Sequence, residues 1–325
     1  MGVATDDDEL VVGVAQIAPV WLQREATLAK VVQWVRRAAA EGCRLVAFGE
    51  ALLPGYPFWL EHTDAARFES PLQKAIHARY VDQSVDIEAG QLSDLCRAAR
   101  DGGIDVVLGI MERPSDRGGH SIYCSRVQLR ADGSIASVHR KLMPTYEERL
   151  SWAQGDGHGL QVHRVGRFSV GSLNCWENWM PLARSALHAQ GEDLHVALWP
   201  GNLRNTEETT RFLAREGRSY VLAASGLLGR GHVPADQPFS AMLDGCPEWL
   251  ANGGSGIMSP SGEWLAGPVV GQEALLVQRL RHSEVLRERQ NFDAVGHYSR
   301  PDVFQLRVDR RRQAVARFVD SGAEG

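Results

Sequence analysis

Cys175 stands where the sequence would best present a nucleophile. An apolar run over residues 168–173 predicts a short buried strand that ends just before it, and Pro181 predicts the first turn of a following helix. A helix N-terminus and nearby cations favour the thiolate, which is the form of cysteine that attacks electrophiles. Trp176 and Trp179 indicate the wall of a site rather than plain core. A lone cysteine is more often a small buried hydrophobe, so the prediction depends on what the rest of the chain supplies.

A glutamate is a better candidate than a histidine for the base that a catalytic thiol needs. None of the eleven histidines stands in a context that singles it out, and His158 and His163 lie in a glycine-rich stretch that favours a solvated role. Glu50 directly follows an apolar run over residues 45–48, where burial would raise the pKa of a carboxyl group towards neutrality. The alternative for any single glutamate is a helix cap or a solvated loop carboxylate, which is the commoner case.

A lysine at another predicted strand end supplies a positive charge. Lys141 follows a predicted strand over residues 135–140. A cation there would stabilise an oxyanion-like intermediate and would lower the pKa of the Cys175 thiol. Most lysines in such positions are solvated surface charges. Glu147 and Glu148 open what we interpret as a short helix, where the helix dipole alone explains acidic residues.

Glu50, Lys141 and Cys175 share one property, because each lies at or just past the end of a predicted strand. Functional sites of sheet-based enzymes form at such ends. The predicted strands cover residues 10–17, 45–48, 104–110, 122–129, 135–140, 168–173, 194–199, 220–224 and 274–280, with a hairpin over residues 257–265. The predicted helices cover residues 26–41, 91–100, 181–190 and 206–216. Strands that alternate with helices and are mixed with hairpins predict mixed sheets carrying helices on one face.

Two hairpins interrupt this alternation. Residues 122–129 and 135–140 flank an Ala-Asp-Gly turn, which is a strong hairpin signal. Residues 257–265 contain Pro-Ser-Gly at their middle and predict a second hairpin, with residues 274–280 as its partner strand. No low-complexity linker divides the chain, so we predict one domain over residues 1–305 and a polar tail over residues 306–325.

Composition excludes several classes of function. The 325 residues carry a net charge of −5, with 44% hydrophobic and 23% charged residues, and lack the concentrated basic face of a nucleic-acid-binding protein. No apolar run is long enough for a membrane span, and the acidic residues 4–9 do not resemble a signal peptide. Five cysteines without a Cys-x-x-Cys pair predict free thiols and a cytoplasmic location. No HExxH or paired-cysteine pattern occurs, so no metal site is expected.

Three segments that contain the candidate residues resemble the signature blocks of the nitrilase superfamily, also called carbon–nitrogen hydrolases. They are FGEALLPGYP at residues 48–57, HRKLMPT at residues 139–145 and LNCWE at residues 173–177. The Cys-Trp-Glu form, the Pro-Gly-Tyr-Pro loop and the ending GHYSRPDV at residues 296–303 are similar to the true nitrilase branch. The resemblance runs from about residue 10 to about residue 305.

The resemblance implies a role for each matching residue. Glu50 is expected to be the general base, Lys141 the cation over the intermediate, and Cys175 the nucleophile. The second glutamate of many members, in a Pro-Thr-x-x-Glu-Arg context, matches Glu148 better than its neighbour. Gly49 departs from the proline that often precedes the base in nitrilases, but this change leaves the carboxylate in place.

The resemblance also implies an α/β fold and an assembly. The expected fold is a four-layer α-β-β-α sandwich of mixed sheets. It pairs through helices into an eight-layer homodimer, and nitrilases often extend into spirals. Residues 310–312, three arginines in the tail, could serve such contacts, although a basic tail is more often simply mobile.

The expected reaction is the hydrolysis of an organic nitrile to a carboxylic acid and ammonia, without a cofactor. A thiolate attacks the nitrile carbon to give a thioimidate, ammonia is lost to leave a thioester, and water attacks the thioester with help from Glu50. Aromatic loops favour an aryl or arylaliphatic nitrile. The residues expected to bind it are Tyr56, Trp59, Trp176, Glu177 and Trp199.

Two alternatives remain at this point. The same three residues would serve an amidase-type carbon–nitrogen hydrolase, or an enzyme that stops at the amide. The second alternative, from a different class, is a non-catalytic assembly module, but such a module has no reason to retain Glu50, Lys141 and Cys175 together.

Overall fold

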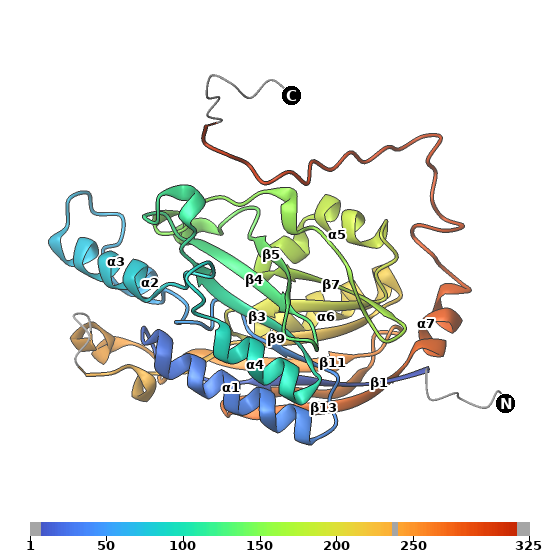
Figure 1. Ribbon diagram of the computed structural model, residues 1–325, viewed down its shortest axis with the longest axis horizontal. Coiled ribbons are helices and arrows are strands. Elements are labelled where there is room, and N and C mark those ends of the chain that lie inside the picture. Colours follow the sequence, from blue (N-terminus) through green and yellow to red (C-terminus); the bar gives the residue numbers. More distant parts are fainter. Residues whose placement is uncertain (1–7, 236–239, 317–325) are drawn as a thin grey trace.

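Two mixed β-sheets pack face to face in the computed structural model, which describes residues 8–235 and 240–316 (Figure 1). The first sheet has the strand order β13-β1-β2-β3-β4-β5, and the second has the order β10-β11-β9-β8-β7-β6 with β12 paired to β11. The strands are β1 (Glu9–Gln16), β2 (Leu45–Phe48), β3 (Asp105–Glu112), β4 (Tyr123–Leu129), β5 (Ile135–Arg140), β6 (His163–Val165), β7 (Phe168–Asn174), β8 (Leu194–Trp199), β9 (Tyr220–Ser225), β10 (Leu227–Gly229), β11 (Trp249–Met258), β12 (Trp264–Val270) and β13 (Ala274–Arg281).

The helices are α1 (Arg24–Ala40), α2 (Trp59–His62), α3 (Pro71–Gln83), α4 (Ser93–Gly102), α5 (Pro181–His188), α6 (Leu203–Gly217) and α7 (His282–Arg289). Of these, α1 and α4 cover the outer face of the first sheet, and α6 covers the outer face of the second. Short 3-10 turns follow several strands, including η3 (Tyr146–Leu150), η4 (Gly157–Gly159) and η5 (Cys175–Trp179). No helix among the described residues has the length and apolar character needed to cross a membrane.

The alternation of side chains along the strands explains the layers. Val46 and Phe48 of β2 pack outward against α1 and α4, whereas Leu45 and Ala47 pack inward against the second sheet, because successive side chains in a strand point to opposite faces. Leu213 of α6 and other apolar residues cover the outer face of the second sheet. The predicted four-layer α-β-β-α sandwich of mixed sheets is therefore confirmed.

Parallel pairing brings the carboxyl ends of the central strands to one edge. β1, β2 and β3 are parallel, as are β7, β8 and β9, while β4 and β5 add an antiparallel hairpin to the first sheet. The hairpin predicted over residues 122–140 is confirmed. Glu50, Lys141 and Cys175 follow β2, β5 and β7, so the sheets deliver all three to the same region of the molecule.

One predicted pairing is wrong. Residues 274–280 do form a strand, but β13 pairs antiparallel with β1 at the opposite end of the chain, with Gly13 opposite Val277. The hairpin of β11 and β12 stays in the second sheet, and the chain then crosses to close the edge of the first sheet. An edge position next to β1 was not visible in the local pattern, since the pairing joins residues far apart in the sequence.

The end of the chain returns over the surface. After α7, the chain passes through turns up to residue 303, and residues 304–316 then run as an extended segment across the molecule (Figure 1). The His158 ring nitrogen of η4 lies 3.1 Å from the Arg310 carbonyl oxygen of this segment. Arg312 Nη1 and the Gln313 backbone N–H donate to the buried Asp156 carboxylate at 3.0 and 3.1 Å. Gly157 makes this crossing possible, because a Cβ there would lie 2.3 Å from the Asp309 carbonyl oxygen.

Candidate active site

A compact cluster of charged and nucleophilic groups lies where β2, β5 and β7 end. The Lys141 ammonium lies 2.8 Å from Glu50 Oε1 and 2.7 Å from Glu148 Oε2. A carboxylate oxygen from each glutamate and the Cys175 sulfur all lie within 4.8 Å of one another. All four side chains are buried, with Cys175 the most exposed at 4%. The structure therefore brings together the four residues predicted to carry the chemistry.

The backbone around Glu50 is fixed by close approaches. The Glu50 N–H donates to the Trp199 carbonyl oxygen at 3.1 Å, which joins this loop to the end of β8. Gly109 on β3 lies beneath it, and a Cβ there would lie 2.3 Å from the Gly49 carbonyl oxygen and 2.7 Å from Glu50 Cα. A Cβ on Gly49 would in turn approach the Gly226 nitrogen to 2.9 Å. Glycine at position 49 thus fits the tight contact with the neighbouring strand end.

Glu50 has the pKa of a group that exchanges protons near neutral pH. Burial raises its pKa to about 7, the Lys141 charge opposes this rise, and the Glu148 charge adds to it. Such a carboxyl can accept and return a proton within one reaction cycle. Its Oε1 also lies 3.4 Å from the Cys124 sulfur.

Lys141 and Glu148 form the second half of the cluster. Burial lowers the pKa of Lys141, but the charges of Glu50, Cys175 and Glu148 outweigh it and raise that pKa well above its ordinary value. Glu148 is held by the Tyr56 hydroxyl, which donates to its Oε1 at 2.8 Å, and by the Thr145 backbone N–H, which donates to its Oε2 at 2.6 Å. The ammonium therefore stays charged between two fixed carboxylates.

Cys175 begins η5 with a backbone φ of 45°, in the left-handed region that side chains other than glycine rarely adopt. Burial raises the pKa of its thiol well above the ordinary value, the Glu50 charge adds to the rise, and the Lys141 charge opposes it. A hydrogen bond from the Trp176 backbone also favours the thiolate. The thiol is therefore protonated at rest, and Glu50 is the adjacent group that can take its proton.

The predicted substrate-binding residues fall in different places. Tyr56 lies in the cluster through its bond to Glu148. Trp59 is buried against Tyr80 in an edge-on contact with ring centroids 4.8 Å apart. Trp199 is also fully buried and packs near Cys175, whereas Trp176 is 53% exposed.

The carboxylate of Glu177 is occupied by the protein itself. It accepts hydrogen bonds from the backbone N–H groups of Leu142 at 2.7 Å and Asn174 at 2.8 Å, and it lies 2.9 Å from the His139 ring nitrogen. These bonds tie the end of β5 to the end of β7. Glu177 thus braces the two strand ends that carry Lys141 and Cys175, and its expected contact with the substrate stays a prediction.

Two residues near the cluster were missed from the sequence. Cys124 lies on β4, which pairs with β5, the strand just before Lys141, and the Lys141 backbone N–H donates to the Cys124 carbonyl oxygen at 2.8 Å. The predicted hairpin could have indicated Cys124, because it places that residue opposite the end of the strand that precedes Lys141. The Trp152 ring lies 5.2 Å from the Lys141 ammonium and packs edge-on against Tyr56, and no local sequence pattern indicates this position.

The Lys141 ammonium already occupies the place where the cluster could bind a metal ion. Glu50, Glu148 and Cys175 could offer three ligand atoms to a metal ion. The Lys141 ammonium, however, lies within hydrogen-bond distance of both carboxylates. A metal ion would have to displace or compete with this charge.

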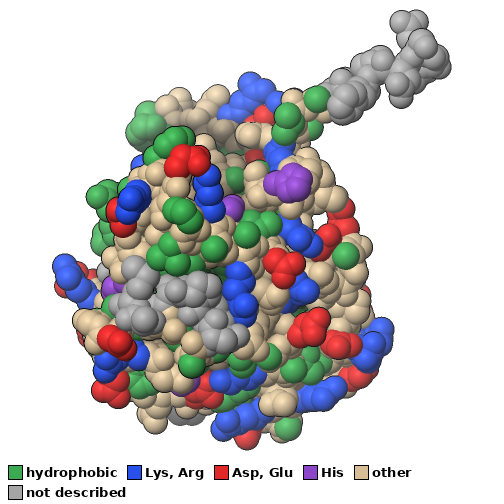
Figure 2. All heavy atoms as spheres, turned by 90° about the vertical axis from the view of Figure 1, so that its left-hand side faces the viewer, with side chains coloured by type: hydrophobic (Ala, Val, Ile, Leu, Met, Phe, Trp, Pro, Cys, Tyr) green, Lys and Arg blue, Asp and Glu red, His purple; other side chains and the backbone are tan. Residues whose placement is uncertain are grey.

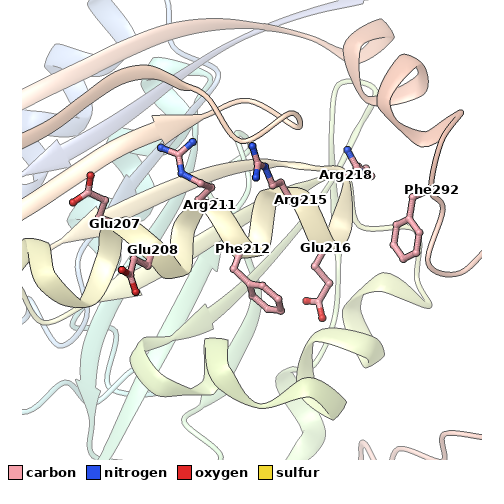
Figure 3. A pocket seen from close by; sticks show the side chains of 8 residues that line it. All are labelled: Glu207, Glu208, Arg211, Phe212, Arg215, Glu216, Arg218 and Phe292. Carbon is pink, nitrogen blue, oxygen red and sulfur yellow. The ribbon is translucent and has the colours of Figure 1, made fainter.

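A separate groove of about 770 Å³ lies along the outer side of α6, on the helix that covers the second sheet (Figure 3). Several of its charged side chains are paired within the chain. Arg211 donates to the Gly262 carbonyl, Arg218 pairs with Glu288 at 3.1 Å, and Glu216 pairs with Arg184. None of the four cluster residues lines this groove.

Comparison with known proteins decides the family. The model of the carbon-nitrogen hydrolase family matches residues 11–287. The chain belongs to the carbon–nitrogen hydrolase family. This confirms the resemblance drawn from the three sequence segments.

Curated relatives place the chain in the nitrilase branch of this family. It is 37% identical to a protein named nitrilase 2 from an unknown prokaryotic organism, over 97% of this chain and 98% of the relative. It is 36% identical to an aliphatic nitrilase from Sinorhizobium fredii, over 91% and 94% of the two chains. It is 32% identical to nitrilase 1 from Arabidopsis thaliana, over 95% and 89%. The chain is therefore a hydrolase that acts on carbon–nitrogen bonds.

Solved structures support the fold. A carbon-nitrogen hydrolase from Helicobacter pylori G27 has a TM-score of 0.70 at 19% identity and covers 92% of this chain and 97% of its own. The amidase from Nesterenkonia sp. AN1, solved as a double mutant with acrylamide, has a TM-score of 0.64 at 18% identity and covers 89% and 97%. At this identity the likeness concerns the sandwich alone.

Proposed function

We propose that this carbon–nitrogen hydrolase converts an organic nitrile to the carboxylic acid and ammonia through a covalent bond to Cys175. The observation that carries the proposal is the buried cluster in which Lys141 bridges Glu50 and Glu148 beside Cys175. The identity to proteins named nitrilase supports the nitrile as substrate.

The first half of the reaction forms the carbon–sulfur bond. Glu50 takes the thiol proton as the sulfur attacks the nitrile carbon, and the proton passes to the nitrile nitrogen to give a thioimidate. The thiol pKa and the Glu50 pKa of about 7 support this coupling, because a thiol held protonated by burial needs an adjacent base. Lys141 and the Trp176 backbone N–H stabilise the negative charge that develops on the substrate.

The second half releases the products. Water adds to the thioimidate carbon with Glu50 as base, and the nitrogen leaves as ammonia after it has been protonated, which leaves a thioester. A second water, activated in the same way, cleaves the thioester to the acid and restores the thiol. Glu148 holds the Lys141 ammonium in place through the cycle, supported by its hydrogen bond from Tyr56.

The substrate class is proposed at a coarser level than the reaction. An aryl or arylaliphatic nitrile was predicted from four aromatic residues, but Trp59 and Trp199 are buried in packing contacts, which weakens that support. Relatives from Sinorhizobium fredii and Rhodococcus rhodochrous are named aliphatic nitrilases, which favours an aliphatic substrate.

A panel assay tests both reaction and substrate. Ammonia and acid are measured from matched aliphatic, arylaliphatic and aryl nitriles and from the corresponding amides. We expect faster ammonia release from a nitrile than from its amide, and acid as the main product. Faster release from the amide would favour the amidase alternative. Accumulation of the amide would favour nitrile hydration.

Assembly and location are also proposals. Trp179, Leu182 and Phe212 are more than half exposed on η5, α5 and α6, which supports a homodimer that pairs through these helices. Extension into a spiral would need a second contact, and a fully active stable monomer in size-exclusion chromatography would remove both. Cys43, Cys96, Cys124 and Cys175 form no disulfide bond, which supports the proposed cytoplasmic location. Positive and negative side chains are interspersed on the face that Figure 2 shows, without a broad basic field for nucleic acid.

A further inference from the structure

A chain of buried side chains leads from β8 to the backbone of Cys175. The Asn178 side chain, fully buried in η5, donates from Nδ2 to the Cys175 carbonyl oxygen at 2.8 Å and to the Leu173 carbonyl oxygen at 3.3 Å. His195 Nε2 lies 2.7 Å from Asn178 Oδ1, and His195 Nδ1 lies 2.7 Å from Glu192 Oε1. The order of contacts is therefore Glu192, His195, Asn178 and Cys175.

The hydrogen-bond partners fix the direction of each bond. Carbonyl oxygens can only accept, so the Asn178 nitrogen faces Cys175 and Leu173 and its oxygen faces His195. His195 must then donate from Nε2. A bond between Nδ1 and the Glu192 carboxylate needs a second proton, so the His195–Glu192 pair holds two protons in this arrangement. The carboxylate keeps the ring oriented towards Asn178.

The neighbouring backbone leaves room for the Glu192 carboxylate. Gly171 lies on β7 opposite His195 in the parallel pairing, and a Cβ at Gly171 would lie 2.0 Å from Glu192 Oε1. Glu192 is 1% exposed and His195 is 5% exposed. A second tether comes from α5, since Arg184 Nη1 donates to the Asn178 carbonyl oxygen at 2.8 Å. The Glu192 carboxylate and the His195 ring thus pack between Gly171 and the Asn178 amide, shielded from solvent.

This series of hydrogen-bonded side chains ends at Cys175, the strained residue of the site. Cys175 has a φ of 45°, and such a conformation persists only where the surroundings hold it. The direction of the Cα–Cβ bond, and with it the sulfur, follows from the backbone that Asn178 clamps on both sides. A displacement of about 1 Å of a reacting group costs on the order of 100-fold in rate.

We propose that His195, held by Glu192, is a positioning residue for the nucleophile, because it orients the Asn178 amide that fixes the backbone of Cys175. This inference rests on the proposed role of Cys175. It concerns the geometry of the thiol and assigns His195 no contact with the substrate.

The variant His195→Leu removes the donor to Asn178, and His282→Leu is a matched control. His282 is another largely buried histidine, lies 2.9 Å from the carboxylate of Asp193 next to Glu192, and has no hydrogen bond to η5 among the described residues. We expect His195→Leu to lower kcat per reactive Cys175 thiol by roughly 10- to 100-fold with KM changed less than about threefold. His282→Leu should keep kcat within about twofold.

Two further variants separate positioning from a merely structural role. His195→Gln retains a donor that can reach Asn178 and should recover part of the kcat lost in His195→Leu. Gly171→Ala displaces the Glu192 carboxylate while it keeps the ring, and it should lower kcat in the same direction. The rate of Cys175 alkylation by iodoacetamide should fall in parallel, measured against total folded protein by circular dichroism.

The outcomes are distinguishable. If His195→Leu and Gly171→Ala lose only thermal stability and keep the kcat per thiol of the His282→Leu control, the positioning role is wrong. If His195→Leu does not fold, Gly171→Ala and Glu192→Gln decide by the same comparison. If Cys175→Ala remains active, the proposed function falls together with this inference. If Cys175→Ala is inactive but His195→Leu and Gly171→Ala are as fast as the parent enzyme, only this inference is wrong.

Discussion

At the scale of single residues, the account depends on proton transfer at Glu50. Because burial raises rather than lowers its pKa, the carboxyl is largely protonated below pH 7 and cannot act as a base there. We expect kcat/KM to rise with pH through an apparent pKa of about 7, which belongs to the coupled cluster as a whole. A pH–rate profile measures this. A flat profile from pH 5 to 9 would contradict the assignment of Glu50.

Substitution of Glu148 should shift this pH–rate profile in a defined direction. The Glu148 charge raises the pKa of Glu50, so Glu148→Gln should shift the acidic limb to lower pH. The variant should also lower kcat, by on the order of 10-fold or more, because Lys141 loses one of its two carboxylate partners. Tyr56→Phe, which removes only the hydrogen bond to Glu148, is a milder control. A shift of the limb to higher pH would refute this electrostatic picture.

Sequence reasoning reached the charged residues of the site but not their supports. Glu50, Lys141 and Cys175 were visible because each follows a predicted strand and stands in a recognisable segment. Glu177 was predicted to bind substrate, although its neighbours in space, Leu142 and His139, occupy its carboxylate. Such contacts join distant strand ends, and no local pattern encodes them.

At the scale of elements, the close approach of β3 to the Glu50 loop positions the base. Gly109→Ala would place a Cβ 2.3 Å from the Gly49 carbonyl and 2.6 Å from the Ala51 nitrogen, both of which are backbone atoms that cannot rotate away. We expect a loss of kcat of roughly 100-fold together with reduced stability. Gly231→Ala is the matched control, since nothing lies within 4 Å of a Cβ there. Equal activity of the two variants would contradict the proposed positioning.

The elements themselves were largely predictable, and their partners were less so. Strands β2, β7 and β8 follow from buried apolar runs, and α1 follows from its apolar stripe. The partner of β13 was wrongly predicted, because the edge of the first sheet is closed by two strands from opposite ends of the chain. Pairing across that separation depends on the whole fold rather than on any turn.

At the scale of the whole molecule, the returning tail stabilises the loop after Lys141. Burial raises the Asp156 pKa, but bonds from Gln313, His158 and Arg312 outweigh it and hold that pKa below its ordinary value of 3.8. Removal of residues 306–325 should lower the Tm by roughly 2–4 °C and leave the four cluster residues in place. Asp156→Asn in the full chain is a control that weakens the same contact.

The sign of the pH effect on this contact follows from the lowered pKa. The stabilisation is present above the ordinary pKa of 3.8 and is lost as the pH falls through the lower folded value. The Tm difference between the full and shortened chains should therefore shrink below about pH 4, as thermal unfolding at several pH values would show. A difference that grows on acidification would contradict the contact.

The central claim is that Cys175 carries the substrate as a covalent intermediate. Intact-protein mass spectrometry of enzyme quenched in acid during turnover of a nitrile tests it directly, with peptide mapping to locate the adduct and Cys175→Ala as control. On the peptide that contains Cys175 we predict an added mass equal to one nitrile for the thioimidate, or to the product acid less one water for the thioester. We predict no adduct and no ammonia release from Cys175→Ala. Ammonia release by Cys175→Ala at the parent rate, without any adduct, would contradict the account.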